Sequence, residues 1–269
     1  MRNAGWEKNA QFRPSAGGVP DRKESYQLQF GDGMTGKWIE EGEVPGFREN
    51  ALKFMHKCQE VSELLMRCFA IGLGFEDEEF FIKAHDVQRK ESQTVLRLLR
   101  YFAVPEEEVQ ATGKRDYVRA GAHVDWDFVT LLFQRSPQES GLEICPGREA
   151  STEFGIGDEW TKVEFEEGDI VCNIGDLLMR WSDDRLKSTF HRVRTPNEKG
   201  DWWGERYSIA YFNQPCTDCV IKGREGKYEE ITGSQFTEQA MKRNFKALRE
   251  KQEALKEIVG NSEEAVSIV

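Results

Sequence analysis

Short apolar segments crowd the stretch between residues 117 and 212, and their spacing limits the possible folds more than any other feature of this chain. Gly, Asp and Pro separate the segments, as is typical of strands joined by turns. They lie at residues 129–133, 142–145, 161–165, 170–174, 189–193 and 207–212. Many short strands at regular spacing predict an antiparallel barrel or a double-sheet jelly roll.

The flanking sequence predicts helices and one further strand. Residues 47–71 carry apolar side chains close to a helical stripe, which Gly72 and Gly74 end. A short helix is expected from about Asp77, and residues 94–103 predict a strand. A charged amphipathic helix capped by Ser234 is expected over residues 234–258. The predicted fold class is therefore mostly β with flanking helices, a jelly roll.

A length of 269 residues suits one large domain of this class. We expect four regions within it: a flexible N-terminal segment (1–22), a helical support region (23–116), the jelly-roll core (117–225), and a C-terminal helix and tail (226–269). The residues with the most chemical interest all fall in the core region, apart from Tyr101.

Composition excludes some classes of partner. A net charge of −11 argues against general affinity for nucleic acid. No apolar run is long enough to span a membrane, and no apolar signal segment opens the chain. We therefore expect a cytoplasmic protein whose six cysteines are reduced. The pair Cys216 and Cys219 would suggest redox chemistry near a βαβ pattern, but none surrounds it, so we interpret these thiols as incidental.

His123, Asp125 and His191 form the candidate metal-binding set. Residues two apart on a strand face the same side, so His123 and Asp125 could reach one metal ion, with His191 arriving from another strand. Two imidazoles and one carboxylate make the facial triad that binds ferrous iron and leaves three positions open. A His-x-Asp sequence alone more often marks surface polarity or a core hydrogen bond. The later His191 and the Arg-x-Ser sequence favour a metal site, and the Asp in place of a third His favours iron over structural zinc.

Arg206 and Ser208 form a candidate carboxylate clamp. A guanidinium group can hold a carboxylate through two hydrogen bonds, and Ser208 would point from the same face of the strand. Most such arginines sit in surface salt bridges. Here the intervening residues are apolar or aromatic, so an inward arginine would need an anionic partner.

Five segments of the chain match a known family. They are Leu-Arg-Leu-Leu-Arg-Tyr (96–101), Arg-Ala-Gly-Ala-His-Val-Asp (119–125), Thr-Leu-Leu-Phe-Gln (130–134), Lys-Ser-Thr-Phe-His-Arg-Val (187–193) and Arg-Tyr-Ser-Ile-Ala-Tyr-Phe (206–212). On these segments, the chain from about Lys23 to about Phe245 resembles the 2-oxoglutarate- and Fe(II)-dependent oxygenases of the isopenicillin N synthase-like superfamily, especially fungal thymine dioxygenase-like members. These segments occur in the family's order and at similar spacing.

The resemblance implies a double-stranded β-helix and assigns roles to single residues. Iron would be bound by His123, Asp125 and His191, and the distal carboxylate of 2-oxoglutarate by Arg206, Ser208 and Tyr101. The implied reaction is the oxidation, typically hydroxylation, of a small molecule by dioxygen with release of succinate and CO2. Fe(II) and 2-oxoglutarate are the expected cofactor and co-substrate, and ascorbate is expected to stimulate turnover.

Two alternatives stay open at this point. The chain could keep the triad without using 2-oxoglutarate, or it could be a non-catalytic or truncated member that binds ligand without turnover. Many relatives have His at position 100, Pro at position 102, and a further segment before the stretch matching 5–8. Lack of that segment is expected to expose a sheet edge. Trp202 and Trp203 could be hydrophobic cover or a lid over substrate.

Overall fold

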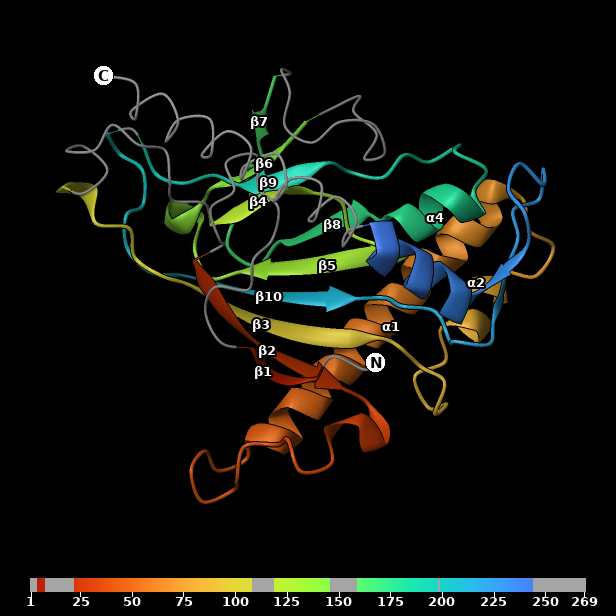
Figure 1. Ribbon diagram of the computed structural model, residues 1–269, viewed down its shortest axis with the longest axis horizontal. Helices are drawn as coiled ribbons and strands as arrows, with labels where there is room; N and C mark the ends of the chain where they lie inside the picture. The colour runs from red at the N-terminus through yellow and green to blue at the C-terminus, as the bar shows by residue number, and fades with distance from the viewer. Residues whose placement is uncertain (1–3, 8–21, 108–118, 146–158, 198, 244–269) are drawn as a thin grey trace, which may run out of the picture.

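Two antiparallel sheets face each other in the computed structural model, which describes residues 4–7, 22–107, 119–145, 159–197 and 199–243 (Figure 1). The larger sheet has the order β1 (Gly5–Glu7), β2 (Lys23–Gln29), β3 (Val95–Tyr101), β10 (Arg206–Phe212), β5 (Val129–Gln134) and β8 (Ile170–Ile174). The smaller sheet has the order β4 (Ala120–His123), β9 (His191–Val193), β6 (Leu142–Ile144) and β7 (Thr161–Lys162).

The chain crosses repeatedly between the two sheets. It passes from β4 in the smaller sheet to β5 in the larger, returns for β6 and β7, crosses to β8, returns for β9, and crosses again to β10. This alternation brings strands distant in sequence side by side, as in a jelly roll. The predicted fold class is confirmed, and all six predicted core strands are present, the segment 161–165 shortened to two residues.

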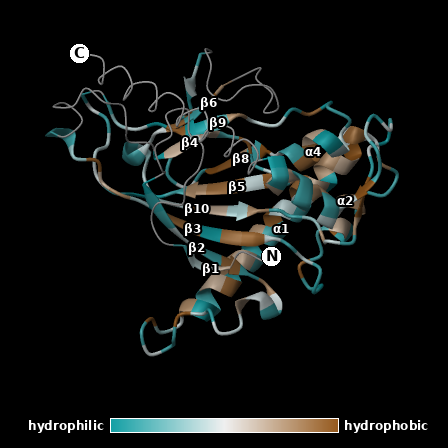
Figure 2. Ribbon diagram, viewed as in Figure 1, coloured by the Kyte–Doolittle hydropathy of each residue, from teal (hydrophilic) through white to brown (hydrophobic). Residues whose placement is uncertain are grey.

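Helix α1 (Phe47–Leu73) covers the outer face of the larger sheet (Figure 1). Its buried side chains, including Met55 and Met66, share one core cluster with Leu131 and Tyr211 of the sheet. Figure 2 shows hydrophobic residues along β5 and on α1. Burying a side chain such as Leu131 stabilises the fold by roughly 1.5–3 kcal/mol. The predicted helix over 47–71 is confirmed, and it ends at Gly74, whose φ of 78° suits glycine.

The inner face of the larger sheet points at the smaller sheet. A second core cluster joins Leu99 and Tyr101 of β3 and Ala210 of β10 to Ala120 and Val193 of the smaller sheet. Because successive side chains on a strand point to opposite faces, β10 sends Tyr211 towards α1 and Arg206, Ser208 and Ala210 into the space between the sheets.

Several expectations need correction. Residues 5–7 fall in the segment predicted to be flexible, yet they pair with β2. The support region contributes β2 and β3 to the larger sheet; β3 was expected over residues 94–103, whereas β2 was not. The division into four regions otherwise stays a prediction. Helix α4 (Asp176–Trp181) was not predicted, and the short helix near Asp77 is α2 (Phe80–Ala84).

The last described helix is capped by Thr232, not by Ser234. Residues 233–243 are helical, and residues 244–258 of the predicted helix lie outside the described part of the chain. The Gln235 N–H donates to Thr232 Oγ1 at 3.2 Å, and the Thr232 N–H donates to Gln235 Oε1 at 2.8 Å. This reciprocal pair is a capping box, which the Thr-x-x-Gln spacing could have indicated.

The remaining elements are short. They are the 3-10 helices η1 (Gly31–Met34) and η2 (Pro137–Glu139) and the two-stranded sheet of β11 (Val220–Ile221) and β12 (Ile231–Thr232). Over the described ranges, no helix combines the length and the apolar character that crossing a membrane requires.

Candidate metal centre and co-substrate pocket

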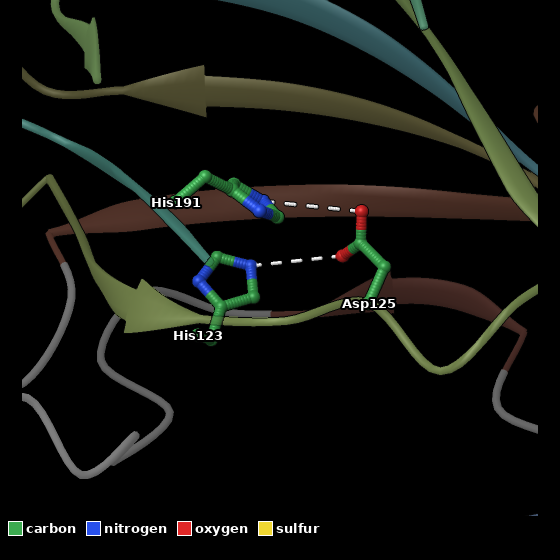
Figure 3. Close-up of side chains that lie close together, drawn as sticks. All are labelled: His123, Asp125 and His191. Atoms are coloured by element: carbon green, nitrogen blue, oxygen red, sulfur yellow. Dashed lines mark ion pairs between the residues drawn. The ribbon is translucent and has the colours of Figure 1, made fainter. Parts of the chain in front are cut away.

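Three side chains converge on one point between the sheets (Figure 3). His123 and His191 are direct partners on the neighbouring strands β4 and β9, with ring centroids 4.3 Å apart. Asp125 Oδ1 lies 3.7 Å from His123 Nε2, and Asp125 Oδ2 lies 3.9 Å from His191 Nε2. One ligand atom from each residue falls within 4.8 Å of the others. Two nitrogens and one oxygen at this separation can bind a single divalent ion on one face.

Backbone carbonyls select the histidine tautomers. His123 Nδ1 lies 2.6 Å from the Gly121 carbonyl oxygen, and His191 Nδ1 lies 2.9 Å from that of Thr189. A carbonyl oxygen only accepts hydrogen bonds, so each Nδ1 carries the proton. In the neutral form of each ring the lone pair is therefore on Nε2, the atom that faces Asp125. The two imidazoles are therefore held ready to coordinate a metal ion, by contacts that the sequence did not identify.

Asp125 is held as a carboxylate. Burial raises its pKa, but the charges of His191 and His123 and hydrogen bonds from Asn173 and Thr130 outweigh burial and bring the pKa to about 2. Asn173 Nδ2 and Thr130 Oγ1 donate to the same oxygen, Oδ2, at 2.9 Å and 2.7 Å. At neutral pH this side chain is an anionic ligand with one oxygen fixed by two neutral donors.

Asp125 reaches the site differently from the sequence prediction. Strand β4 ends at His123, so Asp125 lies on the segment that crosses to β5 and not on the same strand. The two histidines, in turn, come from adjacent strands of one sheet. The three side chains therefore come together from one sheet and a crossover, and not from two residues of one strand as the i, i+2 argument assumed.

Helix α4 fixes the crossover that carries Asp125. The Asp176 N–H donates to the Asp125 carbonyl oxygen at 2.8 Å, and the Leu177 N–H donates to that of Asp127 at 3.2 Å. Gly175 lies so close that a Cβ built on it would be 2.1 Å from the Asp127 carbonyl oxygen. The two backbones can come this close only because glycine has no side chain.

Asp127 is a buried acid that the sequence analysis missed. Burial and the neighbouring charge of Asp125 raise its pKa well above the usual range. Its Oδ2 lies 2.9 Å from Thr130 Oγ1, the hydroxyl that also reaches Asp125. Because a hydroxyl has one proton, Thr130 can donate to only one of the two acids at a time.

Arg206, Ser208 and Tyr101 meet on the inner face of the larger sheet. Arg206 is 1% exposed, and its guanidinium carbon lies 4.9 Å from the Tyr101 ring centroid. Its Nε donates to the Glu139 carbonyl oxygen at 3.1 Å, and its Nη2 donates to Gln134 Oε1 at 2.6 Å. Nη1 lies 3.4 Å from Ser208 Oγ. The three residues predicted to bind a carboxylate are thus neighbours, and Gln134, which the prediction missed, orients the guanidinium group.

The wall beside the triad is polar and aromatic. Phe212 pairs with Thr130 across β10 and β5, which places it at the level of Asp125. The Arg97 guanidinium carbon lies 5.3 Å from the Phe212 ring centroid, and Arg97 Nε donates to Gln27 Oε1 at 3.0 Å.

The Trp202–Trp203 segment is anchored to its surroundings. Trp202 is 38% exposed, and its Nε1 donates to the Glu205 carbonyl oxygen at 2.8 Å. The Trp203 carbonyl oxygen accepts from the Val104 N–H at 2.9 Å. Both roles expected for this segment, hydrophobic cover and a lid over substrate, stay predictions.

The cysteine pair shows no sign of reactivity. Burial raises the pKa of Cys219 to about 12 and also raises that of Cys216. Both are free cysteines, so they are protonated thiols at neutral pH. This agrees with the interpretation of the Cys-x-x-Cys sequence as incidental.

Comparison with known proteins identifies the family of the chain. Residues 92–215, which contain every triad and clamp residue, match the 2OG-Fe(II) oxygenase superfamily. A proline hydroxylase, buaE of Petromyces alliaceus, is 33% identical over 84% of this chain and 70% of its own length. The chain belongs to the 2OG-Fe(II) oxygenase superfamily.

Other family members agree with this assignment. The 2-oxoglutarate-Fe(II) type oxidoreductase ppzD of Metarhizium majus is 32% identical over 76% of this chain. The crystal structure of the thymine 7-hydroxylase of Neurospora crassa in complex with alpha-KG superimposes with a TM-score of 0.72 at 31% identity, covering 89% of this chain and 73% of that one. The chain spans 56% and 61% of the lengths of the two ppzD relatives that it matches.

Proposed function

We propose that this protein is an Fe(II)- and 2-oxoglutarate-dependent dioxygenase that oxidises, typically by hydroxylation, a small-molecule substrate. One observation carries the proposal: a His-Asp-His set whose ligand atoms lie within 4.8 Å of one another faces the same space as a buried Arg-Ser pair. The reaction would consume one dioxygen and one 2-oxoglutarate, place one oxygen atom in the product, and release succinate and CO2.

The donor set fits ferrous iron. His123 and His191 would bind it through Nε2 and Asp125 through Oδ1, since Oδ2 already accepts two hydrogen bonds. Bound iron supplies the redox centre that activates dioxygen. The Asp125 carboxyl group is already ionised, so it has no proton to lose before the metal ion binds.

Arg206 and Ser208 would bind the distal carboxylate of 2-oxoglutarate, with Tyr101 beside them. The guanidinium group is almost wholly removed from water, so pairing with an anion there is stronger than on the surface. Gln134 and the Glu139 carbonyl oxygen occupy two of its donors and fix the direction of the fork. This orientation would set how far the 2-oxo acid end extends towards the triad.

The substrate would lie against the wall of Phe212, Arg97 and Gln27. Relatives differ in substrate: buaE is a proline hydroxylase, and the Neurospora thymine hydroxylase has been crystallised with thymine. We therefore propose a small molecule without naming it, and we expect ascorbate to stimulate turnover. The six free cysteines support a cytoplasmic location, and the net charge of −11 supports a partner other than nucleic acid.

Succinate release tests the proposal without a known substrate. The purified chain, given Fe(II), 2-oxoglutarate, ascorbate and air, should form succinate slowly by uncoupled turnover. His123→Ala, Asp125→Ala and His191→Ala should each abolish stoichiometric Fe(II) binding and succinate formation. His56→Ala is the matched control, since His56 lies exposed on α1 against Phe30. Full activity in two of the three triad variants would exclude the iron assignment, and ligand binding without any succinate would favour a non-catalytic member.

A further inference from the structure

A second buried guanidinium group stands next to the clamp. Arg119, just before β4, is 1% exposed, as is Arg206. Its Nη2 donates to the carbonyl oxygens of Trp202 at 3.0 Å and Gly204 at 2.6 Å. Gly204 lies two residues before Arg206, so both guanidinium groups meet where β10 begins.

The acceptors that these donors need are missing from the described residues. Arg119 Nε and Gln134 Nε2 are both buried and have no hydrogen-bond partner among the residues the structure describes. The other end of the Gln134 amide is turned to Arg206, which fixes Nε2 as the open atom. Leaving a buried donor unpaired is costly, and a ligand that satisfies both must be an acceptor.

The electrostatic environment of Arg119 also favours binding of an anion. No carboxylate pairs with Arg119 within the described ranges, and the nearby Glu139 carboxylate is already bound by Arg135. Burial and repulsion from Arg206 lower the pKa of Arg119 to about 10, so both groups are charged at neutral pH. Two desolvated cations side by side repel each other until an anion binds between or beside them.

We propose that Arg119 is a second cation of the co-substrate pocket, binding the distal carboxylate of a dicarboxylic 2-oxo acid together with Arg206. The inference rests on the proposed function and deepens it. Arg119 also joins the Trp202–Gly204 segment to β4, the strand that carries His123. The charge and the joining role predict different behaviour for two substitutions.

Calorimetric titration of the Mn(II)-loaded chain with 2-oxoglutarate separates these roles. Arg119→Gln removes the charge and should raise the Kd for 2-oxoglutarate about tenfold or more, which is ~1.4 kcal/mol per tenfold. Arg119→Lys keeps the charge but loses the fork and the Nε donor, so its Kd should rise by less, staying at least about threefold below the Kd of Arg119→Gln. The Kd for Mn(II) should stay within about twofold in both variants. Arg185→Gln is the control, because Arg185 also donates to a backbone carbonyl oxygen, that of Leu73.

Each outcome either supports or contradicts the proposed role of the Arg119 charge. A loss in Arg119→Lys equal to that in Arg119→Gln, or an unchanged Kd in Arg119→Gln, would overturn the charge role. Weakened Mn(II) binding would overturn it too, since a displaced β4 would then explain the loss. If Arg119→Gln does not fold, as thermal melting would show, Arg119→Met, which also removes the charge, takes its place under the same limits. Failure of the unmodified chain to bind 2-oxoglutarate would instead reject the proposed function.

Discussion

Substituting Gly175 by Ala should damage the metal centre without touching any ligand. Gly175 precedes α4 and has a φ of −94°, which any residue can adopt, so backbone strain is not the issue. The added Cβ would lie 2.1 Å from the Asp127 carbonyl oxygen and 2.4 Å from Asp127 Oδ1. Such contacts normally exceed 3 Å, so α4 and the crossover must separate by about 1 Å.

The consequence for the site follows from the hydrogen bonds across this contact. The Asp176 N–H holds the Asp125 carbonyl oxygen at 2.8 Å, and separation would stretch or break that bond. Overpacking of this kind costs roughly 1–3 kcal/mol of stability. Ligand positions must hold within about 0.5 Å for full affinity, so the Kd for Mn(II) should rise by about tenfold or more.

Gly72→Ala provides a matched control that should raise the stability of the protein instead of lowering it. Gly72 lies in α1, and a Cβ built on it meets nothing within 4 Å. Ala there should stabilise the protein by roughly 0.5–1 kcal/mol and leave the metal affinity unchanged. Urea unfolding and Mn(II) calorimetry on both variants make the comparison. If Gly175→Ala unfolds and binds Mn(II) like the unmodified chain, the close packing of α4 does not position Asp125.

Two further predictions concern the clamp and acid stability. Arg206→Ala should weaken 2-oxoglutarate binding by roughly 2–5 kcal/mol, because a desolvated charge pair is lost; unchanged binding in calorimetry would reject the clamp. Burial lowers the pKa of His85 from 6.5 to about 4, so the unfolded chain takes up a proton that the folded chain refuses. Stability from this group is therefore complete above pH 6.5 and declines towards pH 4, by ~2 kcal/mol at pH 5. His85→Gln should flatten this part of the urea-unfolding profile, and an unaltered slope between about pH 7 and pH 5 would show that His85 is not the cause.

The two-sheet architecture places the candidate metal ligands and the candidate carboxylate clamp on different parts of the fold. The histidines belong to the smaller sheet, Arg206 and Ser208 to the larger, and Asp125 to a connection between them. A ligand bound at both ends would bridge the sheets. The distance between the sheets, set by the core cluster around Tyr101 and Val193, would then select the length of the 2-oxo acid.

Local sequence was enough to predict the elements that depend on local patterns. Helix α1 follows from apolar residues at helical spacing and from the left-handed conformation that Gly74 adopts at its end. The core strands follow from β-rich segments between turn residues. Residue chemistry alone also selected His123, Asp125 and His191 as candidate metal ligands, and the fold brings these three side chains together.

Contacts between distant segments decided the rest. Gln134 and Arg206 are 72 positions apart, and nothing in either segment indicates that the amide orients the guanidinium group until β5 and β10 pair. Arg119 looks like a surface charge until the two sheets enclose it. Helix α4 is too short for a periodic pattern, yet its packing against the crossover positions Asp125. Side-chain types and short-range spacing are properties of sequence, whereas burial and pairing across sheets exist only once the chain has folded.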